Sequence, residues 1–120
     1  IYPVCNLRSY PGLGKAAPAY GLTTAQLEAQ LYEHNPIDRL APLASAGVPI
    51  FHLHGDADET VPLEDNTALL AERYKKLGGP VTVEVIQGGG HDLGSHWFQS
   101  QALTDFMIAL ALAGNSQEKP

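Results

Sequence analysis

Acidic and histidine side chains gather in two short stretches of the sequence. The first is "HLHGDADETVP" at residues 52–62, which follows the apolar run "VPIF" and contains Asp56, Asp58 and Glu59. The second is "GGGH", which places His91 after three glycines and the run "VTVEVI". In open parallel sheets, functional groups gather at the carboxyl ends of the strands. An acid and a histidine at two neighbouring strand ends would therefore meet through space.

An acid paired with a histidine has a definite chemical use. A carboxylate bonded to one imidazole nitrogen fixes the tautomer, so that the other nitrogen can take a proton from a nucleophile. The carboxylate also stabilises the imidazolium that forms. The glycines at 88–90 would let the histidine loop fold tightly and approach the acid without a side-chain clash.

A metal site is an alternative use of the same residues. "HLHGD" is an H-x-H-x-D string similar to the first half of the metallo-β-lactamase signature, in which another histidine directly follows the acid; here Ala57 stands in that place. Two histidines at alternate positions of a strand lie on one face, as a ligand pair requires. The apolar surroundings instead favour His52 as a hydrogen-bonded core histidine and His54 as a residue that shapes the acid turn.

Each candidate also has a purely structural interpretation. Asp58 would be a solvated acid before a helix, where carboxylates favour the N-terminus, and His91 would be a loop histidine without a function. Asp56 and Glu59 are interpreted as turn and helix-start charges. Asp92, beside His91, is not expected to pair with it. With this interpretation the chain is a non-catalytic α/β scaffold.

The surrounding segments alternate strand and helix. Strands are predicted at 1–6, at 48–54, which is apolar on both faces, and at 81–86, which is rich in β-branched residues. One helix begins at a capping box of Thr23 and Gln26 and ends near residue 35, one runs from residue 62 to "GGP", and an amphipathic one ends the chain. Residues 7–22 are interpreted as a long loop and "IDRLAPLASAG" as a turn or two. The order predicts α/β architecture with a parallel sheet.

Size and composition are those of one modest globular domain. The chain has 120 residues, 44% of them hydrophobic, and a formal net charge of −6, which argues against a nucleic-acid surface. No apolar stretch approaches the roughly 20 residues of a membrane span. The single cysteine, Cys5, excludes an internal disulfide and leaves the compartment open.

The two motifs in this order resemble the C-terminal third of an α/β-hydrolase, closest to the dienelactone hydrolase, acyl-thioesterase and prolyl-oligopeptidase-like branches. There "HG-x-x-D-x-x-VP" carries the triad acid after the seventh strand and "G-x-x-H" carries the histidine after the eighth. The resemblance covers residues 36–112 and implies that Asp58 is the catalytic acid and His91 the catalytic base. It implies that residues 1–120 are the C-terminal portion of a three-layer α/β-hydrolase domain, with its last three strands and their helices. The intact protein would be a serine hydrolase of ester, thioester or peptide bonds that needs no cofactor and no metal.

The third member of the triad is missing from the sequence. The family attacks through a serine on a G-x-S-x-G elbow, and no such elbow occurs here. Ser45, in "LASAG", lacks the first glycine. By the family's chain order, the elbow and the oxyanion hole would lie upstream of Ile1. The chain is therefore expected to be inactive in isolation.

The predicted sheet is too thin to stand alone. Parallel sheets usually extend well beyond three strands, and the chain opens abruptly on "IYPVCN", so we expect a piece of something longer. A truncated sheet leaves an unpaired apolar edge, which invites pairing with another chain. The expected partner is the missing N-terminal part of the fold or a second copy, in a swapped or edge-paired oligomer. The loop at 7–22 is expected to line the substrate pocket, and the substrate is expected to be a small ester or a peptide.

Overall fold

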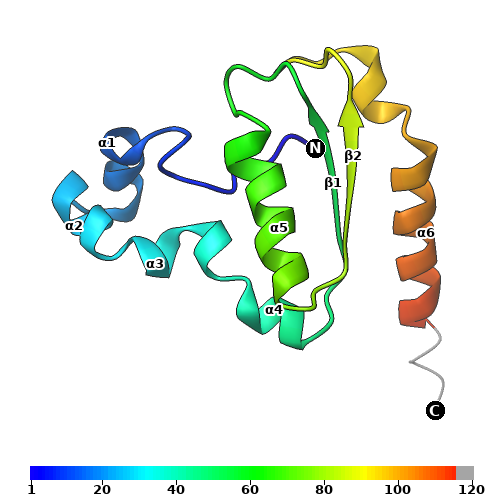
Figure 1. Cartoon of the computed structure of the whole chain (residues 1–120), viewed down its shortest axis with the longest axis horizontal. Coiled ribbons are helices and arrows are strands. Elements are labelled where there is room, and N and C mark those ends of the chain that lie inside the picture. Colours follow the sequence, from blue (N-terminus) through cyan, green and yellow to red (C-terminus); the bar gives the residue numbers. More distant parts are fainter. Residues whose placement is uncertain (116–120) are drawn as a thin grey trace.

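The computed structural model describes residues 1–115, apart from the side chains of residues 95, 96 and 115, and has a mixed α/β architecture. Short helices precede the sheet, and longer helices flank it (Figure 1). In chain order the described elements are α1 (Leu13–Ala16), η1 (Ala17–Tyr20), α2 (Thr24–Ala29), α3 (Leu31–His34), η2 (Pro36–Asp38), α4 (Ala41–Ser45), β1 (Ile50–Gly55), η3 (Glu64–Ala68), α5 (Leu69–Lys76), β2 (Val81–Ile86), η4 (Ser95–Phe98) and α6 (Gln101–Asn115).

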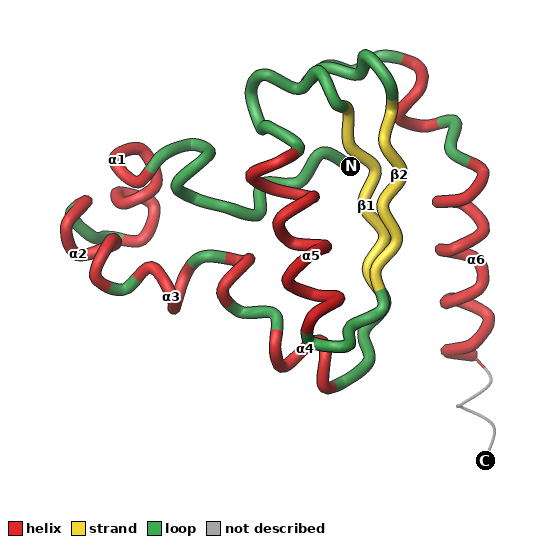
Figure 2. The backbone as a smooth tube through the Cα atoms, viewed as in Figure 1, coloured by secondary structure: helices red, strands yellow, loops and turns green. Residues whose placement is uncertain are grey.

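β1 and β2 pair in parallel, as the sequence predicts. The register runs from Ile50 opposite Val81 to Gly55 opposite Ile86. A parallel pair needs a crossover, which η3 and α5 provide (Figure 2). The two strands consequently end at the same edge of the sheet, and the loops that follow them lie side by side.

Helices cover both faces of this sheet. Strand side chains alternate between the faces. Ile50 packs against the core cluster that contains Tyr74 of α5, whereas the ring of the next residue, Phe51, contacts Phe106 of α6 with a centroid separation of 5.4 Å. The result is a helix–sheet–helix arrangement in three layers (Figure 1). None of the helices within residues 1–115 is both long and apolar enough to span a bilayer.

The main core lies between α5, the sheet and the segment before β1. Leu70 and Tyr74, four positions apart, occupy one face of α5 and are buried. The Tyr74 hydroxyl donates to the carbonyl oxygen of Val48 at 2.6 Å, so the buried phenol is satisfied. The cluster consists of Cys5, Ile37, Leu40, Ala44, Leu70 and Tyr74.

The predicted capping box begins α2. The Thr23 side chain accepts from the backbone N–H of Gln26 at 3.2 Å, and the Gln26 side chain accepts from the backbone N–H of Thr23 at 2.8 Å. The expected single helix is broken at Gln30, where φ is −110°, into α2 and α3. α3 stops before Pro36, because a proline disfavours helical conformation in the residue before it.

Residues 1–6 were predicted to form a strand, and that prediction is wrong. The backbone N–H of Tyr2 donates to the carbonyl oxygen of Leu53 in β1 at 2.7 Å. Pro3 has no N–H to continue a ladder. Farther along, Cys5 and Asn6 donate their backbone N–H groups to the side chain of Asn66 at 2.9 and 3.1 Å. The sheet of the described chain therefore has two strands instead of three.

The segment 7–22 is not the loop that the sequence suggested. It contains α1 and η1, which pack with α2 and α3 around a small core of their own; its members are Leu7, Ala16, Ala17, Leu27 and Leu31. α1 and η1 lie far from the carboxyl ends of the strands (Figures 1 and 2). These two elements therefore do not lie beside the strand ends that carry Asp58 and His91.

Candidate functional site

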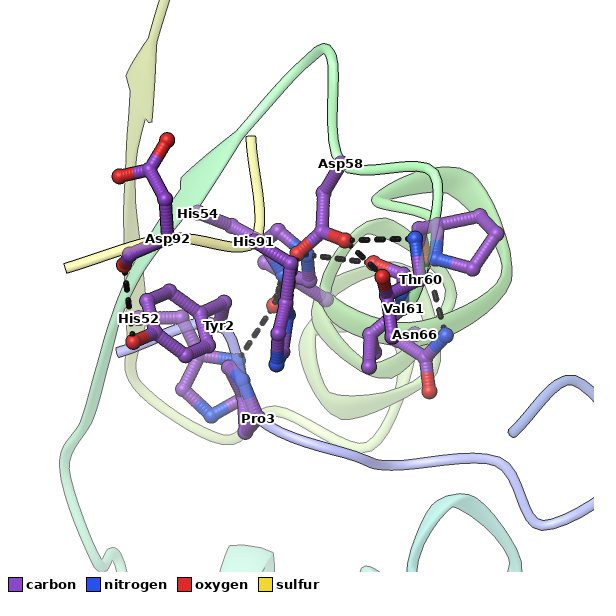
Figure 3. A network of polar contacts seen from close by, with 12 residues as sticks. Tyr2, Pro3, His52, His54, Asp58, Thr60, Val61, Asn66, His91 and Asp92 are labelled. Atoms are coloured by element: carbon purple, nitrogen blue, oxygen red, sulfur yellow. Dashed lines mark hydrogen bonds and ion pairs between the residues drawn. The ribbon is translucent and has the colours of Figure 1, made fainter. Parts of the chain in front are cut away.

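Asp58 and His91 meet at the carboxyl edge of the sheet. Asp58 lies in the turn after β1, and His91 lies in the loop after β2 (Figure 3). Nδ1 of His91 is 2.9 Å from Oδ2 of Asp58, a hydrogen-bonding distance. The spatial contact predicted from the two motifs is therefore present.

The acid turn fixes the Asp58 carboxylate. Its Oδ1 accepts from the backbone N–H groups of Thr60 and Val61 at 3.0 and 2.8 Å, which is a local turn typical of aspartate. Its side chain is 0% exposed. Burial alone would raise the pKa of this carboxyl. The bond from Val61, then the bond and charge of His91, outweigh burial, so that the pKa lies below its usual range.

This geometry assigns the tautomer of His91. An ionised carboxylate can only accept, so Nδ1 carries the proton. Nε2 then carries the lone pair, and no side chain described in the structure bonds to it. The His91 side chain is 32% exposed, on the open side of a fully buried acid. An imidazole held in this way can act as a general base through Nε2.

A second histidine, His54, lies beside Asp58 in the protein interior. Nε2 of the fully buried His54 lies 2.8 Å from the carbonyl oxygen of Val61 and 3.4 Å from Oδ2 of Asp58. Because a carbonyl only accepts, this nitrogen carries the proton and donates to Val61. His54 thus shapes the acid turn, as the sequence suggested.

Thr67 connects the two histidines of the H-x-H string. Its Oγ1 lies 2.7 Å from Nδ1 of His54 and 3.1 Å from Nδ1 of His52. Since Nε2 of His54 is protonated, Nδ1 of a neutral His54 accepts from the Thr67 hydroxyl, and His52 must then donate to Thr67. Burial lowers the pKa of His52 to about 4, which favours its neutral form. His52 is a packed, hydrogen-bonded histidine, as predicted.

The same contacts disfavour the metal alternative. Nε2 of His54 donates to a carbonyl and the lone pair of its Nδ1 accepts from Thr67, so His54 has no free lone pair to offer a metal ion. The carboxylate of Asp58 is already surrounded by N–H donors. Within the described part of the chain, no group of three or more His, Cys, Asp or Glu side chains is arranged to hold a metal ion.

Two glycines bring the acid loop and the histidine loop together. Ala57 donates its backbone N–H to the carbonyl oxygen of Gly89 at 3.0 Å. A Cβ added to Gly55 would lie 2.0 Å from that same oxygen, which is impossible without moving the backbone. The sequence predicted a close approach by residues 88–90. It missed Gly55, although this residue also stands at the end of a strand.

Asp56 holds the loops together from the solvent side. Its Oδ1 accepts from the backbone N–H of Gly88 at 2.7 Å. Gly88 has φ of 69°, in the left-handed region that favours glycine. The sequence interpretation of Asp56 as a turn charge was incomplete, because this carboxylate reaches across to the other loop.

Asn66 fixes the N-terminal segment beside the site, and sequence reasoning missed it. Its side-chain oxygen accepts from Cys5 and Asn6, and its amide nitrogen donates to Ser9 Oγ at 3.0 Å and to the Pro62 carbonyl at 2.9 Å. A signal was available. Positions 66, 70 and 74 are spaced by four, which places Asn66 in line with the buried face of α5.

Other polar residues near His91 have their own partners. Oδ1 of Asp92 accepts from the backbone of Gly94 at 2.7 Å and from Nε1 of Trp97 at 3.0 Å. Ser9 Oγ accepts from Asn66, and Ser100 Oγ bonds the Glu84 carboxylate. Neither of these two serine hydroxyls is bonded to His91.

Comparison of the chain with protein-family models finds no match. Comparison with curated proteins finds no match either. The functional interpretation therefore depends on the geometry of Asp58, His91 and the residues that hold them.

Proposed function

We propose that Asp58 and His91 are the acid and the base of a Ser-His-Asp triad. The protein would then be the C-terminal portion of an α/β-hydrolase that acts on ester, thioester or peptide bonds. The observation that carries this proposal is the 2.9 Å contact between Nδ1 of His91 and a fully buried carboxylate. The parallel strand ends and the motifs that resemble those of the family support it.

In this mechanism Nε2 of His91 takes the proton of a serine hydroxyl while the serine oxygen attacks the carbonyl carbon. The imidazolium is stabilised by Asp58, whose carboxylate stays ionised. His91 next gives the proton to the leaving alcohol, thiol or amine as the bond to it breaks. Water repeats the sequence on the acyl-enzyme, restoring the serine.

We propose that the serine comes from another segment of the hydrolase fold. Ser9 and Ser100 support this, because each hydroxyl is engaged elsewhere. α6 also presents large apolar side chains to solvent, with Met107 62% and Ile108 53% exposed. Apolar exposure of this kind is typical of a surface that another part of a protein covers.

A fluorophosphonate probe, which labels activated serines, tests the proposal on the protein expressed from its full coding sequence. One serine is expected to be labelled, and His91→Ala is expected to slow labelling by about 1000-fold or more, as for removal of a triad base. Glu59→Ala is a matched control, because Glu59 is an exposed acid of the same turn. Absence of labelling, or labelling at the same rate in His91→Ala, would overturn the proposal.

A further inference from the structure

We propose that Tyr2 is a positioning residue for His91, an inference that rests on the proposed function. The Tyr2 ring lies against the His91 ring, with centroids 4.4 Å apart and planes inclined by 56° (Figure 3). Asp58 holds one nitrogen at the edge of the imidazole. Tyr2 occupies one of its faces.

Two contacts of different kinds are needed to fix this imidazole. A ring held by a single hydrogen bond can still tilt about that bond, because the bond constrains only one atom. An aromatic ring against the face prevents the tilt toward that side. Together, Asp58 and Tyr2 fix the position of Nε2. A general base must keep its reacting atom within a fraction of an ångström of the productive position.

Tyr2 is itself held at three points. Its backbone N–H donates to Leu53 of β1 at 2.7 Å, and its hydroxyl donates to the backbone carbonyl of Asp92 at 3.1 Å. Its ring meets Trp97 edge-on at 5.0 Å. A ring fixed in this way can limit the movement of the His91 imidazole beside it.

The loop that carries His91 is hydrogen-bonded to Tyr2 and to Trp97. Asp92, the next residue, accepts from the Tyr2 hydroxyl through its backbone and from Trp97 through its side chain. Trp97 is only 2% exposed, so Asp92 is bonded to a side chain that is fixed in the interior. Tyr2 therefore lies between His91 and Trp97, and Asp92 is the polar partner of Tyr2 and Trp97.

The backbone of Tyr2 adopts an uncommon conformation to reach this position. Its φ is 31°, and it is the one non-glycine residue with positive φ in the described chain. Residues with a Cβ seldom adopt such values, and those that do gather at functional sites. Here the conformation accompanies both the bond to Leu53 and the contact with His91.

Solvent exchange of the His91 Nδ1–H proton, measured by NMR, tests the proposal on the protein expressed from its full coding sequence. Tyr2→Leu keeps apolar bulk but removes the ring and the hydroxyl. We expect exchange about tenfold faster, the size of effect that loss of one aromatic contact produces. Tyr2→Phe keeps the ring and loses only the bond to Asp92, so exchange about threefold faster is expected.

Tyr20→Leu is the matched control. The Tyr20 ring contacts the ring of His34 at 4.6 Å and 46°, a pair of similar geometry that is separate from Asp58 and His91. This variant is expected to leave the His91 proton unchanged. Equal exchange in Tyr2→Leu and Tyr20→Leu would overturn the role of Tyr2. If Tyr2→Leu does not fold, Tyr2→Phe becomes the test. Exchange at the wild-type rate in Tyr2→Phe would then overturn the positioning role of Tyr2.

The same spectra separate this proposal from the proposed function. If the wild-type Nδ1–H signal does not depend on Asp58, as Asp58→Asn would reveal, the triad proposal fails. If it depends on Asp58 but not on Tyr2, the triad proposal stands and the positioning role of Tyr2 fails.

Discussion

Gly55 and Gly89 pack backbone against backbone where the two strands end, so closely that a Cβ on Gly55 would lie 2.0 Å from the carbonyl oxygen of Gly89. This contact brings the turn that carries Asp58 within reach of the loop that carries His91. The acid–base pair therefore depends on a position that takes no part in any chemistry.

Gly55→Ala is expected to separate the two loops. The added methyl group meets backbone atoms, which cannot move aside like a side chain, so we expect a loss of about 2–4 kcal/mol in the free energy of unfolding. Urea denaturation measures it. Gly90→Ala, in the histidine loop next to Gly89, is the control, because its added Cβ would meet its nearest neighbour at an ordinary 3.5 Å. Equal stability of the two variants would contradict this account.

Asp56→Ala is expected to loosen the histidine loop without unfolding the protein. The variant loses the 2.7 Å bond to the backbone N–H of Gly88, so exchange of that amide should accelerate by about tenfold. Asp56→Asn keeps an acceptor oxygen and should retain most of the protection. Glu59→Ala removes an exposed acid from the same turn and should have no effect. Unchanged exchange in Asp56→Ala would show that the bond does not hold the loop.

Asn66→Ala is expected to destabilise the protein by about 2–4 kcal/mol, because it leaves the buried N–H of Cys5 without its acceptor. Chemical denaturation measures the change. Asp65→Ala, which alters the neighbouring exposed residue, should cost less than about 0.5 kcal/mol. Similar losses of stability in both variants would contradict the hydrogen bonds between Asn66 and the N-terminal segment.

His52 predicts a pH dependence of stability. Its pKa is about 4 in the folded protein, below the ordinary value of about 6.5, so the unfolded chain binds the proton more readily. Between these values stability rises with pH, and it is lost as the pH falls from about 6.5 toward 4, by roughly 3 kcal/mol. His52→Gln should flatten this part of a denaturation-versus-pH curve. A wild-type curve that is already flat there would contradict the assignment.

Asp58 contributes to the pH dependence of stability at a lower pH than His52 does. Its pKa is lowered in the folded state, so its contribution is present above the ordinary value of about 4 and is lost as the pH falls through the folded-state pKa. Asp58→Asn should remove this acid limb and leave the His52 window intact. The two substitutions thus serve as controls for each other.

The parts of the fold that the sequence predicts are those with a local cause. The capping box fixes the start of α2, the β-branched run gives β2, and the spacing of Leu70 and Tyr74 gives the buried face of α5. The meeting of Asp58 and His91 follows from the rule that parallel strands end at one edge. These inferences need only neighbouring residues or a general rule of topology.

The parts that the sequence does not predict depend on distant partners. Residues 1–6 have the composition of a strand, but Pro3 has no N–H for a ladder and Asn66 takes the N–H groups of Cys5 and Asn6. Tyr2 was unrecognisable as a neighbour of His91, because only the folded chain brings the two rings together. Asp56 was likewise underestimated, since its partner is the backbone of the other loop.

The most direct test of the central claim is the protonation of the two His91 ring nitrogens, read from ¹⁵N chemical shifts at about pH 8, where imidazoles are ordinarily neutral. We predict a protonated Nδ1, hydrogen-bonded to Asp58, and an unprotonated Nε2. Asp58→Asn should abolish this preference. A proton on Nε2, or a mixture of tautomers that Asp58→Asn leaves unchanged, would contradict the assignment of Asp58 and His91 as a catalytic pair.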